Sequence, residues 1–148
     1  ALDWGLDITH LDSHMGTLQL DERYCDIYLE VAAEHDLPVR LSGRSTEALL
    51  GFPFRDRADE AGLVAPDHLI VGMGPGVRDA LASLRPGVTE VYFHPATDSA
   101  EIRALAPDAE IRVTDAADLA AGGSIEALLA AAGATTISYR PLRDLQRS

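Results

Sequence analysis

Short β-rich runs alternate with segments of helical periodicity along this chain of 148 residues. Strands are predicted over residues 8–13, 39–41, 68–71, 88–93 and 135–139, and helices over residues 21–35, 47–50, 77–84, 102–105 and 125–132. Two parallel strands need a long crossover between them, and a helix usually supplies it. Strands that alternate with helices are therefore expected to pair in parallel. About five such strands predict the α/β class, with a mostly parallel sheet and flanking helices.

Local signals predict how several of these helices begin and which side they bury. In the helix over residues 21–35, the buried face is expected to carry Tyr24, Ile27, Tyr28, Val31 and Ala32. Ser45 is expected to cap the second helix, and Asp98 with Glu101 forms a capping-box pattern before the fourth. Residues 51–66 read as irregular, which predicts an excursion or lid.

No repeat or linker divides the chain, so residues 1–148 are expected to form a single domain. The apolar fraction of 47% is sufficient for one packed core. The glycine-rich run Gly72-Met73-Gly74-Pro75-Gly76 lacks the spacing of a nucleotide-binding loop and predicts a plain turn.

Charge and cysteine content narrow the function classes. The formal net charge is −12, which argues against nucleic acid and anionic membranes as partners and suits a small-molecule enzyme. No apolar run approaches the roughly 18–20 residues of a membrane span. The single cysteine, Cys25, excludes an internal disulfide and is compatible with the reducing cytoplasm.

A pattern of alternating polar residues marks the first predicted strand. Because alternate residues of a strand share a face, His10, Asp12 and His14 are expected to point the same way. Three polar groups on one face are costly unless they are used. The pattern therefore predicts a metal site or an acid–base site.

Further candidates lie near the ends of other predicted strands, where function collects in parallel α/β folds. His94 ends the strand over residues 88–93. Arg40 and Arg140 each lie in or next to a strand, and either is expected to pair with Asp12 or to bind substrate oxygens. An equally weighted alternative is that these arginines form salt bridges with surface acids.

Several motifs together resemble one family. The first is Thr9-His10-Leu11-Asp12-Ser13-His14, and the second is Thr89-Glu90-Val91-Tyr92-Phe93-His94-Pro95-Ala96. Weaker similarity lies in Glu34-His35-Asp36-Leu37-Pro38-Val39-Arg40 and in Ile137-Ser138-Tyr139-Arg140. In their order along the chain, these four motifs resemble those of the YdjC-like carbohydrate deacetylases.

The resemblance implies the second half of a distorted (β/α) barrel that removes acetyl groups from N-acetylated sugars such as chitooligosaccharides. It implies a divalent metal, Mg or Zn, with His14 as a ligand and His10 beside it. Asp12 would take a proton from water, and His94 would act as catalytic acid or substrate contact. Arg40 and Arg140 are expected to bind the acetylated sugar.

One family motif has no counterpart, because no two aspartates are adjacent in this chain. The expectation is a fragment that corresponds to the C-terminal half of a deacetylase, which binds metal weakly and self-associates, as a homodimer or otherwise. Two alternatives stay open. One is a noncatalytic sugar-binding or assembly module derived from that fold. The other is an unrelated metal hydrolase in which His10, Asp12, His14 and His94 converge on one ion.

Overall fold

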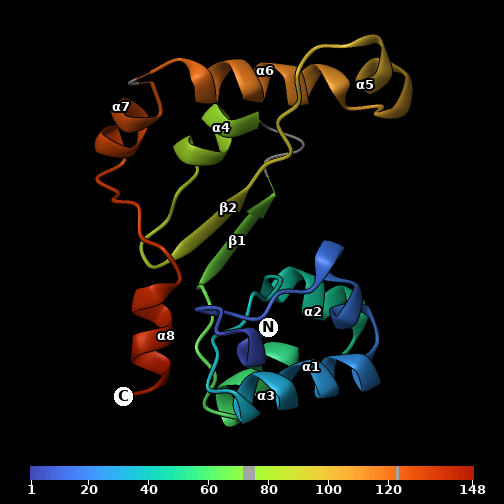
Figure 1. Cartoon of the computed structure of the whole chain (residues 1–148), viewed down its shortest axis with the longest axis vertical. Coiled ribbons are helices and arrows are strands. Elements are labelled where there is room, and N and C mark those ends of the chain that lie inside the picture. Colours follow the sequence, from blue (N-terminus) through green and yellow to red (C-terminus); the bar gives the residue numbers. More distant parts are fainter. Residues whose placement is uncertain (72–75, 123) are drawn as a thin grey trace. The chain divides into compact units, whose positions relative to one another are not determined.

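The computed structural model describes residues 1–71, 76–122 and 124–148 (Figure 1). Its elements, in chain order, are η1 (Leu2–Trp4), η2 (His14–Leu20), α1 (Glu22–Glu34), α2 (Arg44–Leu50), α3 (Phe54–Glu60), β1 (His68–Val71), α4 (Gly76–Ala82), β2 (Thr89–Tyr92), α5 (Ala100–Leu105), α6 (Ala109–Ala120), α7 (Ser124–Ala131) and α8 (Arg140–Gln146).

The chain divides into two compact units. The first unit consists of Ala1–Asp67 together with Ile137–Ser148, and the second consists of His68–Thr136. The C-terminal helix α8 therefore belongs with the N-terminal part of the chain.

Helix α1 supplies one side of the core of the first unit. Asp21 caps it, with the side chain accepting a hydrogen bond from the backbone N–H of Arg23 at 3.0 Å. The buried residues of the helix are Cys25, Tyr28, Leu29 and Ala32. Tyr24 and Ile27 are exposed, so the predicted face was displaced by about one residue. The two faces share the same helical spacing, and tertiary packing decides between them.

Residues 51–66 belong to this core and do not form a lid. Phe54 opens helix α3 and is fully buried, as is Ala58 one turn later. The Phe52 and Phe54 rings pack edge to face with their centroids 5.7 Å apart. The prediction was wrong because the Phe-Pro-Phe run looks irregular in sequence, whereas its aromatic rings anchor the chain to the core.

The first two predicted strands are extended segments that meet at one point. Leu11 and Val39 form an isolated parallel bridge, and no strand is assigned over residues 8–13 or 39–41. The N–H of Leu11 donates to Pro38 O at 2.9 Å, and that of Arg40 donates to Leu11 O at 3.1 Å. The Tyr28 hydroxyl, from α1, lies 2.7 Å from Leu11 O and 3.0 Å from Arg40 O and donates between them. A side chain thus supports these two segments in place of a longer ladder.

The second unit contains the parallel pair β1–β2, in register from His68↔Thr89 to Val71↔Tyr92 (Figure 1). Both strands and helix α4 lie where the sequence predicts them, to within a few residues. Helix α4 packs against α6 and α7. The buried carboxylate of Asp115, on α6, accepts the N–H of Val77 at 2.9 Å and so holds the first turn of α4.

Other predicted boundaries need correction. Ser99, not Asp98, caps α5 by accepting the N–H of Ile102, and Ser45 lies inside α2, which begins after Gly43. No strand is assigned over residues 135–139, which lead directly into α8. Helices α6 and α8 were not predicted. The turn expected over residues 72–76 lies outside the described residues except for Gly76.

The described residues thus form a mixed α/β structure with a two-stranded parallel sheet and many helices. The expected second half of a barrel stays a prediction. Within the described ranges, no helix is long and apolar enough to cross a membrane.

Candidate functional site

Exposure alternates along the predicted site segment of the first unit. Leu11 packs against the core and Ser13 is buried, whereas Asp12 and His14 are exposed. This alternation is what an extended chain lying on a core produces. Asp12 and His14 therefore sit on the outward side of the segment, and His10 is half-buried.

The chain turns sharply directly after His14. Met15 and Gly16 both have left-handed backbone conformations, with φ of 57° and 66°. The Ser13 side chain holds this turn by accepting the N–H of Leu18 at 2.9 Å, and the Thr17 hydroxyl donates to His14 O at 3.0 Å. A methionine in this region is uncommon for a residue with a Cβ and costs free energy. His14 is thus fixed at the start of a tight turn, where η2 begins.

Asp12 is paired with a candidate from another segment. The Arg40 guanidinium donates to the Asp12 carboxylate at 2.7 Å. Arg40 is itself held through its backbone carbonyl, which accepts from the Gln19 amide at 3.2 Å. The predicted contact between this arginine and Asp12 is present, and it orients the carboxylate.

His10 lies against an aromatic ring from the C-terminal part of the chain. The imidazole stacks on the Tyr139 ring with centroids 3.8 Å apart and an interplanar angle of 11°. The Nδ1 atom of His10 is 2.9 Å from the Thr9 hydroxyl. The stack therefore restrains the plane of the His10 ring, and the Thr9 contact restrains which edge of the ring faces Thr9.

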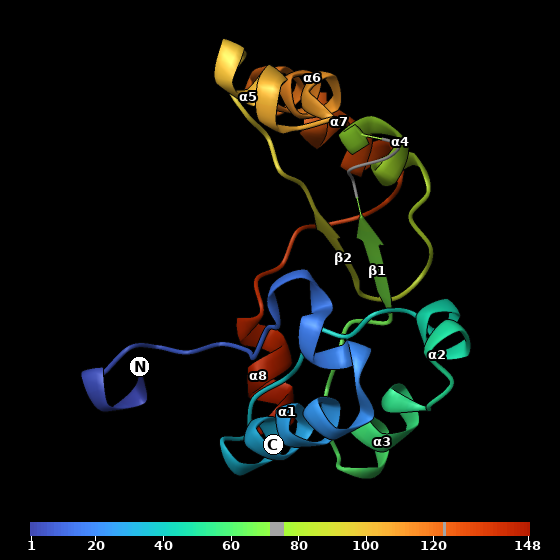
Figure 2. The ribbon, with the colours of Figure 1, turned by 90° about the vertical axis from the view of Figure 1, so that its right-hand side faces the viewer.

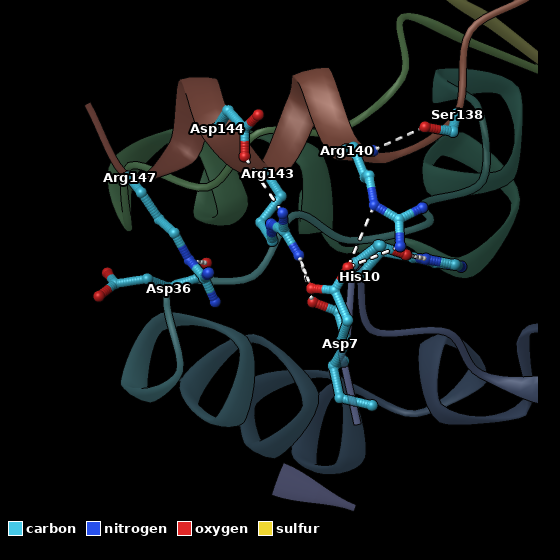
Figure 3. A network of polar contacts seen from close by, with 10 residues as sticks. Asp7, His10, Asp36, Ser138, Arg140, Arg143, Asp144 and Arg147 are labelled. Carbon is cyan, nitrogen blue, oxygen red and sulfur yellow. Dashed lines mark hydrogen bonds and ion pairs between the residues drawn. The ribbon is translucent and has the colours of Figure 1, made fainter. Parts of the chain in front are cut away.

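Arg140 does not reach Asp12 but pairs with Asp7, at 2.6 Å from Nη2 and 3.1 Å from Nε (Figure 3). Arg143 also donates to Asp7. The hydrogen bond from Arg140, then that from Arg143, lowers the pKa of the Asp7 carboxyl below its ordinary value of 3.8. Arg140 therefore forms a salt bridge with a surface acid, which was the alternative expected for this residue.

His94 lies in the second unit, two residues beyond the end of β2, and is exposed. Its ring meets that of Tyr92 edge to face at 5.7 Å. Arg112, from α6, donates to His94 O at 3.4 Å and also to Asp108 at 2.8 Å. The hydrogen bond from Arg112 is the main cause that lowers the pKa of the Asp108 carboxyl, and the nearby His94 lowers this pKa to a smaller extent. The predicted strand-end position of this histidine is confirmed.

Comparison with known proteins bears on these motifs. The sequence model of the YdjC-like protein family matches residues 1–129, a range that holds both histidine motifs. The chain belongs to the YdjC-like family. The comparison with curated proteins gives no match.

A solved structure supports the fold of this YdjC-like chain. It comes from Enterococcus faecalis and is described as that of a candidate cellobiose-phosphate cleavage protein. The TM-score is 0.71 at 16% sequence identity, and the match covers 95% of this chain but 55% of that one. The YdjC-like chain therefore spans about half the length of this relative. At such identity the likeness shows the fold alone.

A divalent metal, which the family resemblance implies, needs several converging ligands. Across the described ranges, no three His, Cys, Asp or Glu side chains gather so that they could hold an ion. Within the first unit, Asp12 is engaged by Arg40 and His10 stacks on Tyr139. These residues of the YdjC-like chain do not by themselves fit a complete metal site.

Sequence reasoning missed the partners that hold the candidates in place. Tyr139 was quoted only as part of a weak motif, and Asp7, Asp108 and Arg112 were not singled out. Asp7 and Arg140 are 133 positions apart, and no local spacing indicates such a pair. The sequence indicated one of these partners only through the motif Ser138-Tyr139-Arg140, in which an aromatic residue directly precedes a candidate arginine.

Proposed function

We propose that this chain acts as part of a carbohydrate deacetylase that hydrolyses the acetamide of N-acetylated sugars of the chitooligosaccharide type. The observation that carries the proposal is the family match over residues 1–129, which contains both histidine motifs. The coverage of about half of the Enterococcus faecalis relative supports the further proposal that the chain is a fragment of a larger deacetylase.

The reaction adds water to the acetyl carbon, breaks the carbon–nitrogen bond and releases acetate and a sugar amine. We assign Asp12 as the base that takes a proton from water, because Arg40 holds its carboxylate at 2.7 Å on an exposed surface. We assign His94 as the acid that gives a proton to the leaving amine, because it is exposed beyond a strand end with its backbone fixed by α6. Arg40 and Arg140 are proposed to bind substrate oxygens.

The proposal includes a divalent metal, Mg or Zn, with His14 as ligand and His10 beside it. Since the described residues gather no complete ligand set, the other ligands are proposed to come from residues outside this chain. The proposal also includes self-association, because exposed apolar side chains such as Trp4 and Met15 favour burial.

The test is acetate release from chitobiose with added Mg or Zn. It is run on the 148-residue chain and on the full translated product of its gene. We expect metal-dependent acetate release from the full product, with a loss of at least about 100-fold in His94→Ala, in line with a general acid. His68→Ala is the matched control, because His68 opens β1 in the same unit and has no assigned role.

The alternative is a noncatalytic sugar-binding or assembly module derived from the same fold. It is favoured by the incomplete ligand set of the described residues. Saturable chitobiose binding without acetate release from either protein would support this alternative and contradict the deacetylase proposal.

A further inference from the structure

The segment that carries His10 has little regular pairing of its own. In the described residues, its only assigned sheet partner is the bridge between Leu11 and Val39. An extended segment with so few ladder hydrogen bonds does not fix the side chains that precede the bridge. The position of the His10 imidazole therefore depends on contacts from elsewhere.

Two contacts fix different degrees of freedom of the imidazole. The parallel stack on Tyr139, at 3.8 Å and 11°, fixes the plane of the ring. The 2.9 Å contact between Nδ1 and the Thr9 hydroxyl selects one of the two ring orientations, related by a half-turn about the last torsion, that share this plane. Rotation about the last torsion of histidine is otherwise broad, so both restraints matter.

Tyr139 is itself anchored by the helix that follows it. Arg140 and Arg143 both donate to Asp7, and Arg143 also donates to Ile8 O at 3.2 Å (Figure 3). At the far end of α8, Gln146 donates to Gly62 O at 2.8 Å. These contacts tie α8 to the two residues just before the histidine motif and to the loop after α3.

We propose that Tyr139 is a positioning residue for His10, and that α8 holds the two rings together by fixing Asp7 and Ile8. The arginines align the chain on one side of His10, and the tyrosine ring presents the surface on which the imidazole lies. The proposal concerns an element beyond residues 1–129, where the family match ends. Its catalytic consequence rests on the proposed function, whereas its geometry does not.

The geometry is tested by nuclear magnetic resonance on the full 148-residue chain. We expect nuclear Overhauser contacts between the His10 and Tyr139 ring protons, and an upfield shift of the His10 ring protons. The shift should disappear in Tyr139→Leu, persist in Tyr139→Phe and persist in the matched control Tyr24→Leu, which removes an exposed tyrosine of the same unit. Absence of ring contacts in the unmodified chain would overturn the proposal, even if no variant folds.

The catalytic consequence is tested in the full translated product. We expect Tyr139→Leu to lower kcat by roughly 10-fold to 100-fold with little change in KM, and Tyr139→Phe to restore it. Equal kcat in the leucine and phenylalanine variants would overturn the positioning role. If no protein releases acetate, the proposed function fails, while the resonance measurement still decides whether Tyr139 positions His10.

Discussion

At the scale of single residues, burial sets the reactivity of the cysteine on α1. Cys25 has no exposed surface, and desolvation, with a smaller contribution from Asp26, raises the pKa of its thiol to about 11. The thiolate is the reactive form of cysteine. Cys25 is therefore a packing residue of α1 and takes no part in the proposed chemistry.

We predict that Cys25 resists thiol reagents at pH 7 in the folded chain and reacts fully once urea unfolds it. The measurement is the rate of labelling by a chromogenic disulfide reagent with and without urea. Rapid labelling without denaturant would contradict the burial of Cys25 in α1.

Asp115 is a second residue whose effect follows from burial. Its carboxylate accepts the N–H of Val77, which loses its partner in Asp115→Ala. We predict a loss of about 1–2 kcal/mol in the free energy of unfolding, as for other capping residues. The matched control is Glu110→Ala, on the same helix, which removes an exposed ion pair with Arg103 and should cost less than about 1 kcal/mol. Urea unfolding curves of both variants compare the two costs.

At the scale of elements, sequence periodicity identified β1, β2, α1, α4 and α7 because each has a clear local pattern. The strands expected over residues 8–13 and 135–139 have the same β-rich composition but lack a neighbouring strand among the described residues. Strand formation depends on a partner distant in sequence, so composition alone overestimates it. Helix α8 was missed because Pro141, which breaks a helix interior, lies at its start. Proline is nevertheless favoured in the first turn of a helix.

The candidate site could be predicted in part for the same reason. His10, Asp12, His14 and His94 stand out by local pattern, and their strand-end or outward positions follow from it. The ring against which His10 lies does not follow from local pattern, because Tyr139 reaches this histidine through the long-range packing of the C-terminal segment. The contact between Arg40 and Asp12 was one of the options expected for this arginine, because both residues lie in or next to predicted strands.

We predict that Tyr28→Phe destabilises the first unit by about 1–3 kcal/mol, because the Leu11 and Arg40 carbonyls lose a buried donor. Tyr24→Phe, on the exposed side of the same helix, should change the free energy of unfolding by less than about 0.5 kcal/mol. Thermal unfolding of the two variants compares them directly. Equal effects would mean that Tyr28 does not bridge these segments.

Docking of α8 is predicted to depend on pH. Since the ion pairs with Arg140 and Arg143 lower the pKa of Asp7, their contribution is fully present above pH 3.8 and is lost as pH falls through the folded-state value. The protection of the α8 amides, measured as the intrinsic exchange rate divided by the observed rate at the same pH, should therefore decrease at acidic pH. In Asp7→Asn this dependence should be absent, and an unchanged profile in that variant would assign it to another group.

At the scale of the whole molecule, the chain belongs to the YdjC-like family, and its described residues gather no complete set of metal-ligating side chains. The proposed self-association follows from the exposed apolar residues of the N-terminal stretch, which leads away from the helices of the first unit (Figure 2). We predict concentration-dependent association in sedimentation velocity that Trp4→Ser weakens and Leu105→Ser, an exposed leucine of the second unit, does not. A single monomeric species at all concentrations would contradict it.

We propose that this chain carries only part of a deacetylase metal site. The proposal is tested by calorimetric titration of the 148-residue chain with Zn and with Mg. We predict weak binding that does not saturate at one ion per chain and that decreases further in His14→Ala, while His35→Ala, at the end of α1, leaves it unchanged. Tight one-to-one binding would overturn the proposal, because it would require a complete ligand set within these 148 residues.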